Sequence, residues 1–73
     1  MTYCIAVFRS RSQAIDCKNA LARAGIWAEI TATPAALGLG CGLSVRFRYS
    51  SYRRAKNLIS HAAYTAFYGY ITA

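Results

Sequence analysis

The residue with the clearest chemical potential is Cys41, which has a glycine on each side and lies in a segment without charged residues. Glycines leave a neighbouring sulfur atom uncovered, and their flexible backbone can turn several N–H groups toward it. Oriented amides and nearby arginines would favour the thiolate over the thiol, and the thiolate is the reactive form. We therefore predict a nucleophilic or carrier thiolate at Cys41. The residues predicted to bind its substrate are Gly40, Gly42, Arg46 and Arg48.

The alternative for Cys41 is a structural role, in which it is a small hydrophobic residue at the entry to a strand and the glycines serve only the turn. Cys4 and Cys17 favour such a role more strongly, because one lies in an apolar run and the other on the apolar side of a predicted helix. The wide spacing of the three cysteines and the single histidine argue against a zinc site within one chain. No metal or other cofactor is predicted.

Other chemistries lack the residues that they need. The pattern Gly38-x-Gly40-x-Gly42 is followed by a predicted strand, whereas a dinucleotide-binding fingerprint requires a helix at that place. The two acidic residues, Asp16 and Glu29, lie on different predicted elements, so paired-carboxylate catalysis is not supported. We therefore expect a carrier or binding protein rather than an enzyme.

Two strands and a helix are predicted before the segment that carries the candidate cysteine. Tyr3–Phe8 is an apolar run rich in aromatic and β-branched residues, which favours a buried strand. Ser10 or Ser12 can cap a helix whose apolar positions recur at helical spacing until Gly25 ends it. Residues 26–32 form the second predicted strand, which ends before a proline because proline cannot donate to a ladder.

A strand, a helix and a last strand are predicted after that segment. Residues 43–49 alternate so that one face is apolar and the other carries arginines. Ser50-Ser51 offers a second capping site, and residues 64–73 are rich in tyrosine and suit a strand. The apolar stripe predicted for the second helix consists of Tyr52, Ala55, Leu58, Ile59 and Ala62. The order β-α-β-β-α-β predicts a single α+β domain over residues 1–73 with a ferredoxin-like fold, in which two helices cover one face of a four-stranded antiparallel sheet.

The chain is strongly basic, since nine lysine and arginine residues against two acidic residues give a formal charge of +7. This charge raises an alternative function, a small RNA- or DNA-binding module in which Arg46 and Arg48 contact phosphates and aromatic residues of the sheet stack on bases. The candidate stacking residues are Tyr3, Phe8, Phe47 and Tyr49. The alternation of the third strand places Phe47 and Tyr49 opposite to the two arginines. A solvated basic surface is therefore the favoured interpretation of the charge.

Four short motifs are distributed along nearly the whole chain. They are Phe8-Arg9-Ser10 before a helix, Ala24-Gly25-Ile26 after it, Thr33-Pro34, and Cys41-Gly42-Leu43-Ser44-Val45-Arg46-Phe47. Together they resemble the putative selenium/sulfur carrier protein-like family of small domains, from Tyr3 to about Ile71. The most specific element is Thr-Pro, a loop, and then Cys-Gly-Leu-Ser. The resemblance implies that Cys41 holds sulfur or selenium as a persulfide or perselenide.

We therefore predict a carrier that delivers sulfur or selenium to an acceptor enzyme, with donor and acceptor proteins as its partners. A structural or regulatory subunit that docks through its sheet face is a further alternative. An open sheet face and a tyrosine-rich tail favour a homodimer. No secretory signal and no bilayer-spanning run is apparent, and an odd number of cysteines suits reduced thiols. We expect a cytoplasmic protein without a membrane partner.

Overall fold

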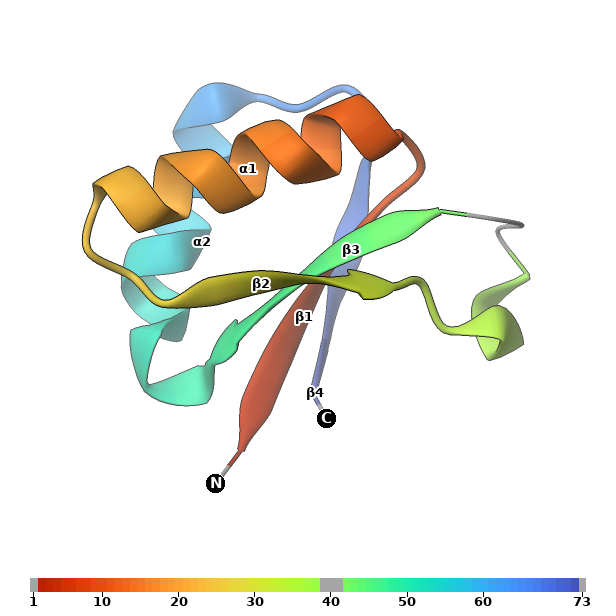
Figure 1. The fold of residues 1–73 in the computed structure, drawn as a ribbon, viewed down its shortest axis with the longest axis horizontal. Helices are drawn as coiled ribbons and strands as arrows, with labels where there is room; N and C mark the ends of the chain where they lie inside the picture. The colour runs from red at the N-terminus through yellow and green to blue at the C-terminus, as the bar shows by residue number, and fades with distance from the viewer. Residues whose placement is uncertain (1, 39–41, 73) are drawn as a thin grey trace.

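The computed structural model describes residues 2–38 and 42–72, whose elements are arranged as Figure 1 shows. Gly40 and Cys41 of the predicted site lie outside the described residues. The helices and strands follow the predicted order β-α-β-β-α-β. They are β1 (Tyr3–Phe8), α1 (Arg11–Arg23), β2 (Ala28–Ala32), β3 (Leu43–Arg48), α2 (Tyr52–Ala62) and β4 (Phe67–Thr72), with the short 3₁₀ helices η1 (Ala35–Leu37) and η2 (Tyr49–Ser51).

The four strands form one antiparallel sheet in the order β2-β3-β1-β4, so that β1 and β3 are central. The predicted α+β ferredoxin-like fold is therefore confirmed. Because side chains alternate along a strand, residues that pair across β1 and β3 share a face. Cys4 pairs with Phe47 on the face that packs against the helices, and Ile5 pairs with Arg46 on the other face. We call this second face the open face of the sheet.

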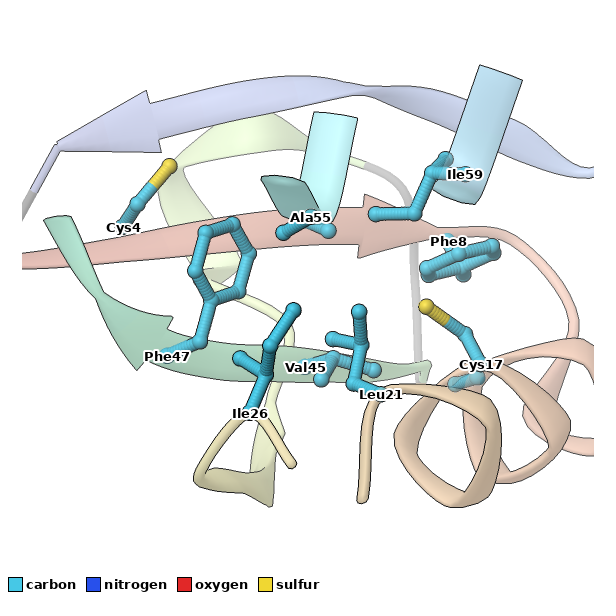
Figure 2. Close-up of a cluster of buried hydrophobic side chains, with 11 residues drawn as sticks. Cys4, Phe8, Cys17, Leu21, Ile26, Val45, Phe47, Ala55 and Ile59 are labelled. Atoms are coloured by element: carbon cyan, nitrogen blue, oxygen red, sulfur yellow. The ribbon is translucent and has the colours of Figure 1, made fainter. Parts of the chain in front are cut away.

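The hydrophobic core lies between the sheet and both helices, as Figure 2 shows. Cys17 and Leu21 of α1 and Ala55 and Ile59 of α2 reach the same side of the sheet, where they join Phe47 in one cluster. Each of these side chains is at most 3% exposed. Since burial of one large apolar side chain contributes about 1.5–3 kcal/mol, this cluster is the main source of stability in so short a chain.

Both ends of α1 follow the sequence prediction. Ser10 is the N-cap, and its Oγ accepts a hydrogen bond from a first-turn N–H at 3.3 Å. At the other end Gly25 has a φ of 80°, and the N–H of Ile26 donates to the carbonyl oxygen of Leu21 at 2.9 Å, which is the Schellman arrangement. Because the helix end uses this N–H, β2 begins at Ala28 and not at residue 26 as predicted.

The second helix differs from the prediction in its start and in its buried side. The hydroxyl of Ser51 caps none of the described N–H groups, because φ and ψ of −98° and 6° continue the 3₁₀ turn, whereas a capping serine has extended backbone. Leu58 is 38% exposed and Ala62 is exposed as well. The sheet contacts the side of α2 that holds Ala55 and Ile59, four residues apart, so the predicted apolar stripe was too wide.

Two of the four residues predicted to stack on bases are excluded from that role. Phe8 and Phe47 are 0% exposed in the core, so neither ring can reach a ligand. Tyr49 is 51% exposed but lies in η2, because β3 ends at Arg48 where the 3₁₀ turn begins. Of the four, only Tyr3 belongs to the open face.

Tyr70 offers a test of how polar groups are placed in the core. Its hydroxyl is buried and has no hydrogen-bond partner among the residues described, and burial raises its pKa to about 12. The hydroxyl of Tyr64 instead donates to Asp16 Oδ2 at 2.8 Å. We expect Tyr70→Phe to leave the free energy of unfolding unchanged or to raise it, whereas Tyr64→Phe lowers it by about 1 kcal/mol. Urea denaturation compares the two variants, and a greater loss for Tyr70→Phe would contradict the assignment.

Candidate functional site

Thr33 and Ser44 close the base of the segment that carries Cys41. The N–H of Thr33 donates to the carbonyl oxygen of Gly42 at 3.1 Å, and the hydroxyls of Thr33 and Ser44 are hydrogen-bonded at 2.8 Å. Thr33 is 8% and Ser44 0% exposed, so the hydroxyl pair is shielded from water, where a hydrogen bond is electrostatically stronger. The two ends of the segment are therefore joined at Gly42, the residue that directly follows Cys41 in the sequence.

Gly42 occupies a place in which a side chain has no room. A Cβ atom there would lie 3.0 Å from Thr33 Oγ1 and 3.2 Å from the backbone oxygen of Phe8. The hydroxyl is held by Ser44, and the oxygen belongs to the end of a central strand, so neither atom can move away easily. The sequence prediction placed Gly42 at the site for its flexibility, and the structure adds a steric reason for glycine.

Gly42→Ala is expected to lower the free energy of unfolding by about 1–3 kcal/mol, the usual cost of overpacking a tight contact. Gly69→Ala is the matched control, because nothing lies within 4 Å of a Cβ at Gly69. Thermal unfolding of both variants measures the difference. Equal effects at the two positions would show that the close approach at Gly42 is unimportant.

The described part of the loop before this point consists of a short helical turn. Pro34 precedes η1, and Gly38 ends it with a φ of 67°, in the left-handed region that glycine adopts readily. Gly40 and Cys41 lie outside the described residues. Their assignments as a substrate-binding residue and as the carrier thiolate therefore stay predictions.

Arg46 and Arg48 lie on the open face, away from Gly42 along β3. With about 3.3 Å per residue along a strand, their Cα atoms are about 13 and 20 Å from that of Gly42. The Arg46 guanidinium forms an ion pair with Glu29, and Arg48 lies over the ring of Trp27, 4.7 Å from its centroid. The structure brings the two arginines together around Trp27 and not around Gly42. Their predicted role in substrate binding stays a prediction.

Trp27 is a residue of this face that the sequence prediction missed. It lies two residues before Glu29, and the alternation of β2 continues back to it, so both side chains lie beside Arg46. The signal was therefore present as a period of two. It was obscured because residues 26 and 27 precede the strand proper, which begins at Ala28.

Cys4 and Cys17 are core residues, as predicted, with exposed fractions of 2% and 1%. Burial raises the pKa of both thiols, and for Cys17 the adjacent Asp16 carboxylate adds to the effect and the pKa reaches about 12. The nucleophilic form of cysteine is the thiolate. Both thiols are therefore held in their unreactive form at neutral pH.

The described surface has no other built site. Within residues 2–38 and 42–72, no three histidine, cysteine, aspartate or glutamate side chains come together in a way that could hold a metal ion. The same two ranges form no pocket. None of the helices described is long and apolar enough to cross a membrane.

The comparison with known families places the chain directly. The model of a family described as putative Se/S carrier protein-like matches residues 3–68, which run from β1 into β4 and include Thr33, Cys41, Gly42 and Ser44. No curated protein and no solved structure was found to match the chain. The family match agrees with the resemblance carried by the Thr-Pro and Cys-Gly-Leu-Ser motifs, whose hydroxyl residues the structure joins by a hydrogen bond. The chain therefore belongs to the putative Se/S carrier protein-like family.

Proposed function

We propose that this protein is a carrier that holds a sulfur or selenium atom on Cys41 and passes it to an acceptor protein. The observation that carries the proposal is membership of the family over residues 3–68, a range that includes Cys41. The burial of Cys4 and Cys17 supports the same assignment, because their thiols are protonated in the core. Cys41 is the remaining cysteine of the chain.

The proposed loading step is an exchange between a thiolate and a persulfide. The Cys41 thiolate attacks the terminal sulfur of a donor R–S–SH, forming a new S–S bond as the S–S bond of the donor breaks. The products are a Cys41 persulfide and the donor thiolate R–S⁻, and no oxidant or reductant is consumed. Delivery is the same exchange toward the thiolate of an acceptor. A donor R–S–SeH would leave a perselenide on Cys41 in the same way.

The closed base of the loop supports this role. The hydrogen bonds of Thr33 to Gly42 and to Ser44 fix the chain directly after Cys41. Transfer between proteins requires that the attacked atom, the attacking atom and the leaving group are aligned, so a fixed attachment point favours it. The protein would be loaded and unloaded once per cycle as a carrier and would not turn over a substrate as an enzyme does. A compartment with reduced thiols, such as the cytoplasm, suits this chemistry.

The test is intact-mass measurement after exposure to a small-molecule persulfide donor. We expect wild-type protein and Cys17→Ala to gain one sulfur atom, and Cys41→Ser to gain none. Cys17→Ala is the matched control because it removes a thiol that is already enclosed in the core. The proposal fails if Cys41→Ser gains sulfur as readily as the wild type, or if the wild-type protein gains none.

A further inference from the structure

Four side chains on the open face form what we call the arginine–aromatic cluster: Tyr3, Trp27, Arg46 and Arg48. The Arg46 guanidinium lies over the ring of Tyr3, 4.4 Å from its centroid, and 6.0 Å from that of Trp27. Arg48 lies over Trp27 at 4.7 Å, and the two rings are 5.9 Å apart. The cluster is therefore an array of alternating planar cations and rings, built on the central strands β1 and β3 and on the residue before β2.

The cluster is accessible and carries excess positive charge. Trp27 is 40% exposed, and the Arg46 side chain is 36% exposed. Glu29 pairs with Arg46, and among the described residues it is the one acidic side chain in an ion pair. Arg48 has no such partner within the same part of the chain. A guanidinium that stacks through its face keeps the N–H groups at its edge available for an anion such as phosphate.

The shape of this surface indicates what it binds. The described residues form no pocket, so the open face offers flat rings and planar cations but no cavity for a side chain or a compact ligand. Nucleobases are planar, stack on both aromatic rings and guanidinium planes, and are joined by phosphates. We propose that the arginine–aromatic cluster binds single-stranded nucleic acid, with bases stacked at Trp27 and Tyr3 and phosphates on Arg46 and Arg48.

Two other occupants fit the surface less well. A second copy of this chain would bring a further net charge of +7 against the same face, and like charges oppose that contact. An acidic peptide that adds a strand would use the edges of the sheet, which are β2 and β4, whereas the cluster is centred on β1 and β3. The proposal is also independent of Cys41, because the arginines lie away from Gly42 along β3.

Trp27 is the single tryptophan of the protein, so its fluorescence reports directly on the cluster. The wild-type protein is titrated with oligothymidylate or oligouridylate of about 10 nucleotides, a length within the range that small binding domains cover. We expect saturable quenching of Trp27, weakened as salt increases. The same quenching is expected for Cys41→Ser, which separates this proposal from the carrier function.

Two pairs of matched variants test the location, with binding followed by the anisotropy of a labelled oligonucleotide. Arg46→Ala/Arg48→Ala should weaken binding on the order of tenfold and lower the salt slope by about 1.4, or about 0.7 for each phosphate contact. Arg53→Ala/Lys56→Ala removes the same charge from exposed positions of α2 and should have a much smaller effect.

The two acidic residues of the chain give the second pair. Glu29→Gln releases Arg46 from its ion pair and should strengthen binding, whereas Asp16→Asn adds the same charge on α1 and should change affinity much less. Equal effects within either pair would overturn the proposed site. So would the absence of quenching at low salt, or quenching by polyglutamate at the same concentrations, which would assign the cluster to acidic proteins.

Discussion

Replacing Phe47 by alanine is expected to lower the free energy of unfolding by about 3–5 kcal/mol, the usual cost of truncating a buried phenylalanine. Phe47 is 0% exposed and lies in the core where β3 faces both helices. A chain of 73 residues has a total free energy of unfolding of roughly 4–11 kcal/mol. One substitution therefore removes a large share of the stability. Urea denaturation followed by far-ultraviolet circular dichroism measures the loss.

Leu58→Ala is the matched control for this truncation. Leu58 is 38% exposed on α2, although its spacing predicted a place in the apolar stripe. We expect its loss to cost less than about 1 kcal/mol, because a half-exposed side chain leaves no enclosed cavity. If Leu58→Ala were as destabilising as Phe47→Ala, the side of α2 that faces the sheet would have been assigned wrongly.

The second large effect concerns the reactivity of Cys17. Burial, with a contribution from the Asp16 carboxylate, raises the pKa of this thiol from 9.0 to about 12. At pH 8 the fraction of thiolate is then lower by about a thousandfold, and alkylation proceeds through the thiolate. We expect iodoacetamide to modify Cys17 in the folded protein at least about a thousand times more slowly than in the urea-unfolded chain.

Peptide mapping after timed alkylation provides the measurement for each cysteine separately. Cys4, which is 2% exposed, serves as a second internal reference, and its raised pKa predicts protection in the same direction. Modification of Cys17 at the rate of an ordinary thiol in folded protein would contradict the core assignment. It would also remove the support that the buried cysteines give to Cys41 as the carrier.

The order of elements could be predicted because each leaves a local signal. The apolar run Tyr3–Phe8, the helical spacing up to Gly25 and the alternation of β3 each specify one element without long-range information. The errors lie at element ends, where one local interaction displaces another. The N–H of Ile26 is taken by the end of α1, and the backbone of Ser51 continues a 3₁₀ turn in place of the extended conformation that a capping serine needs.

The site was predictable only in part, because it depends on contacts between distant residues. Sequence analysis selected Gly42, Arg46 and Arg48, but no local pattern shows that Thr33 and Ser44 share a hydrogen bond across the sheet. The arginines were predicted to assist a thiolate, and the structure places them in an array with aromatic rings instead. Sheet register decides both points, and it emerges only when the strands are paired.

The central claim, that Cys41 carries a transferable sulfur atom, is tested most directly by counting the sulfur that the loaded protein releases. Cyanide removes the terminal sulfur of a persulfide as thiocyanate and leaves the thiolate, so the thiocyanate formed counts the carried atoms. After loading and removal of excess donor, we predict close to one thiocyanate per wild-type chain and none for Cys41→Ser. Equal release from the two proteins, or none from the wild type, would contradict the account.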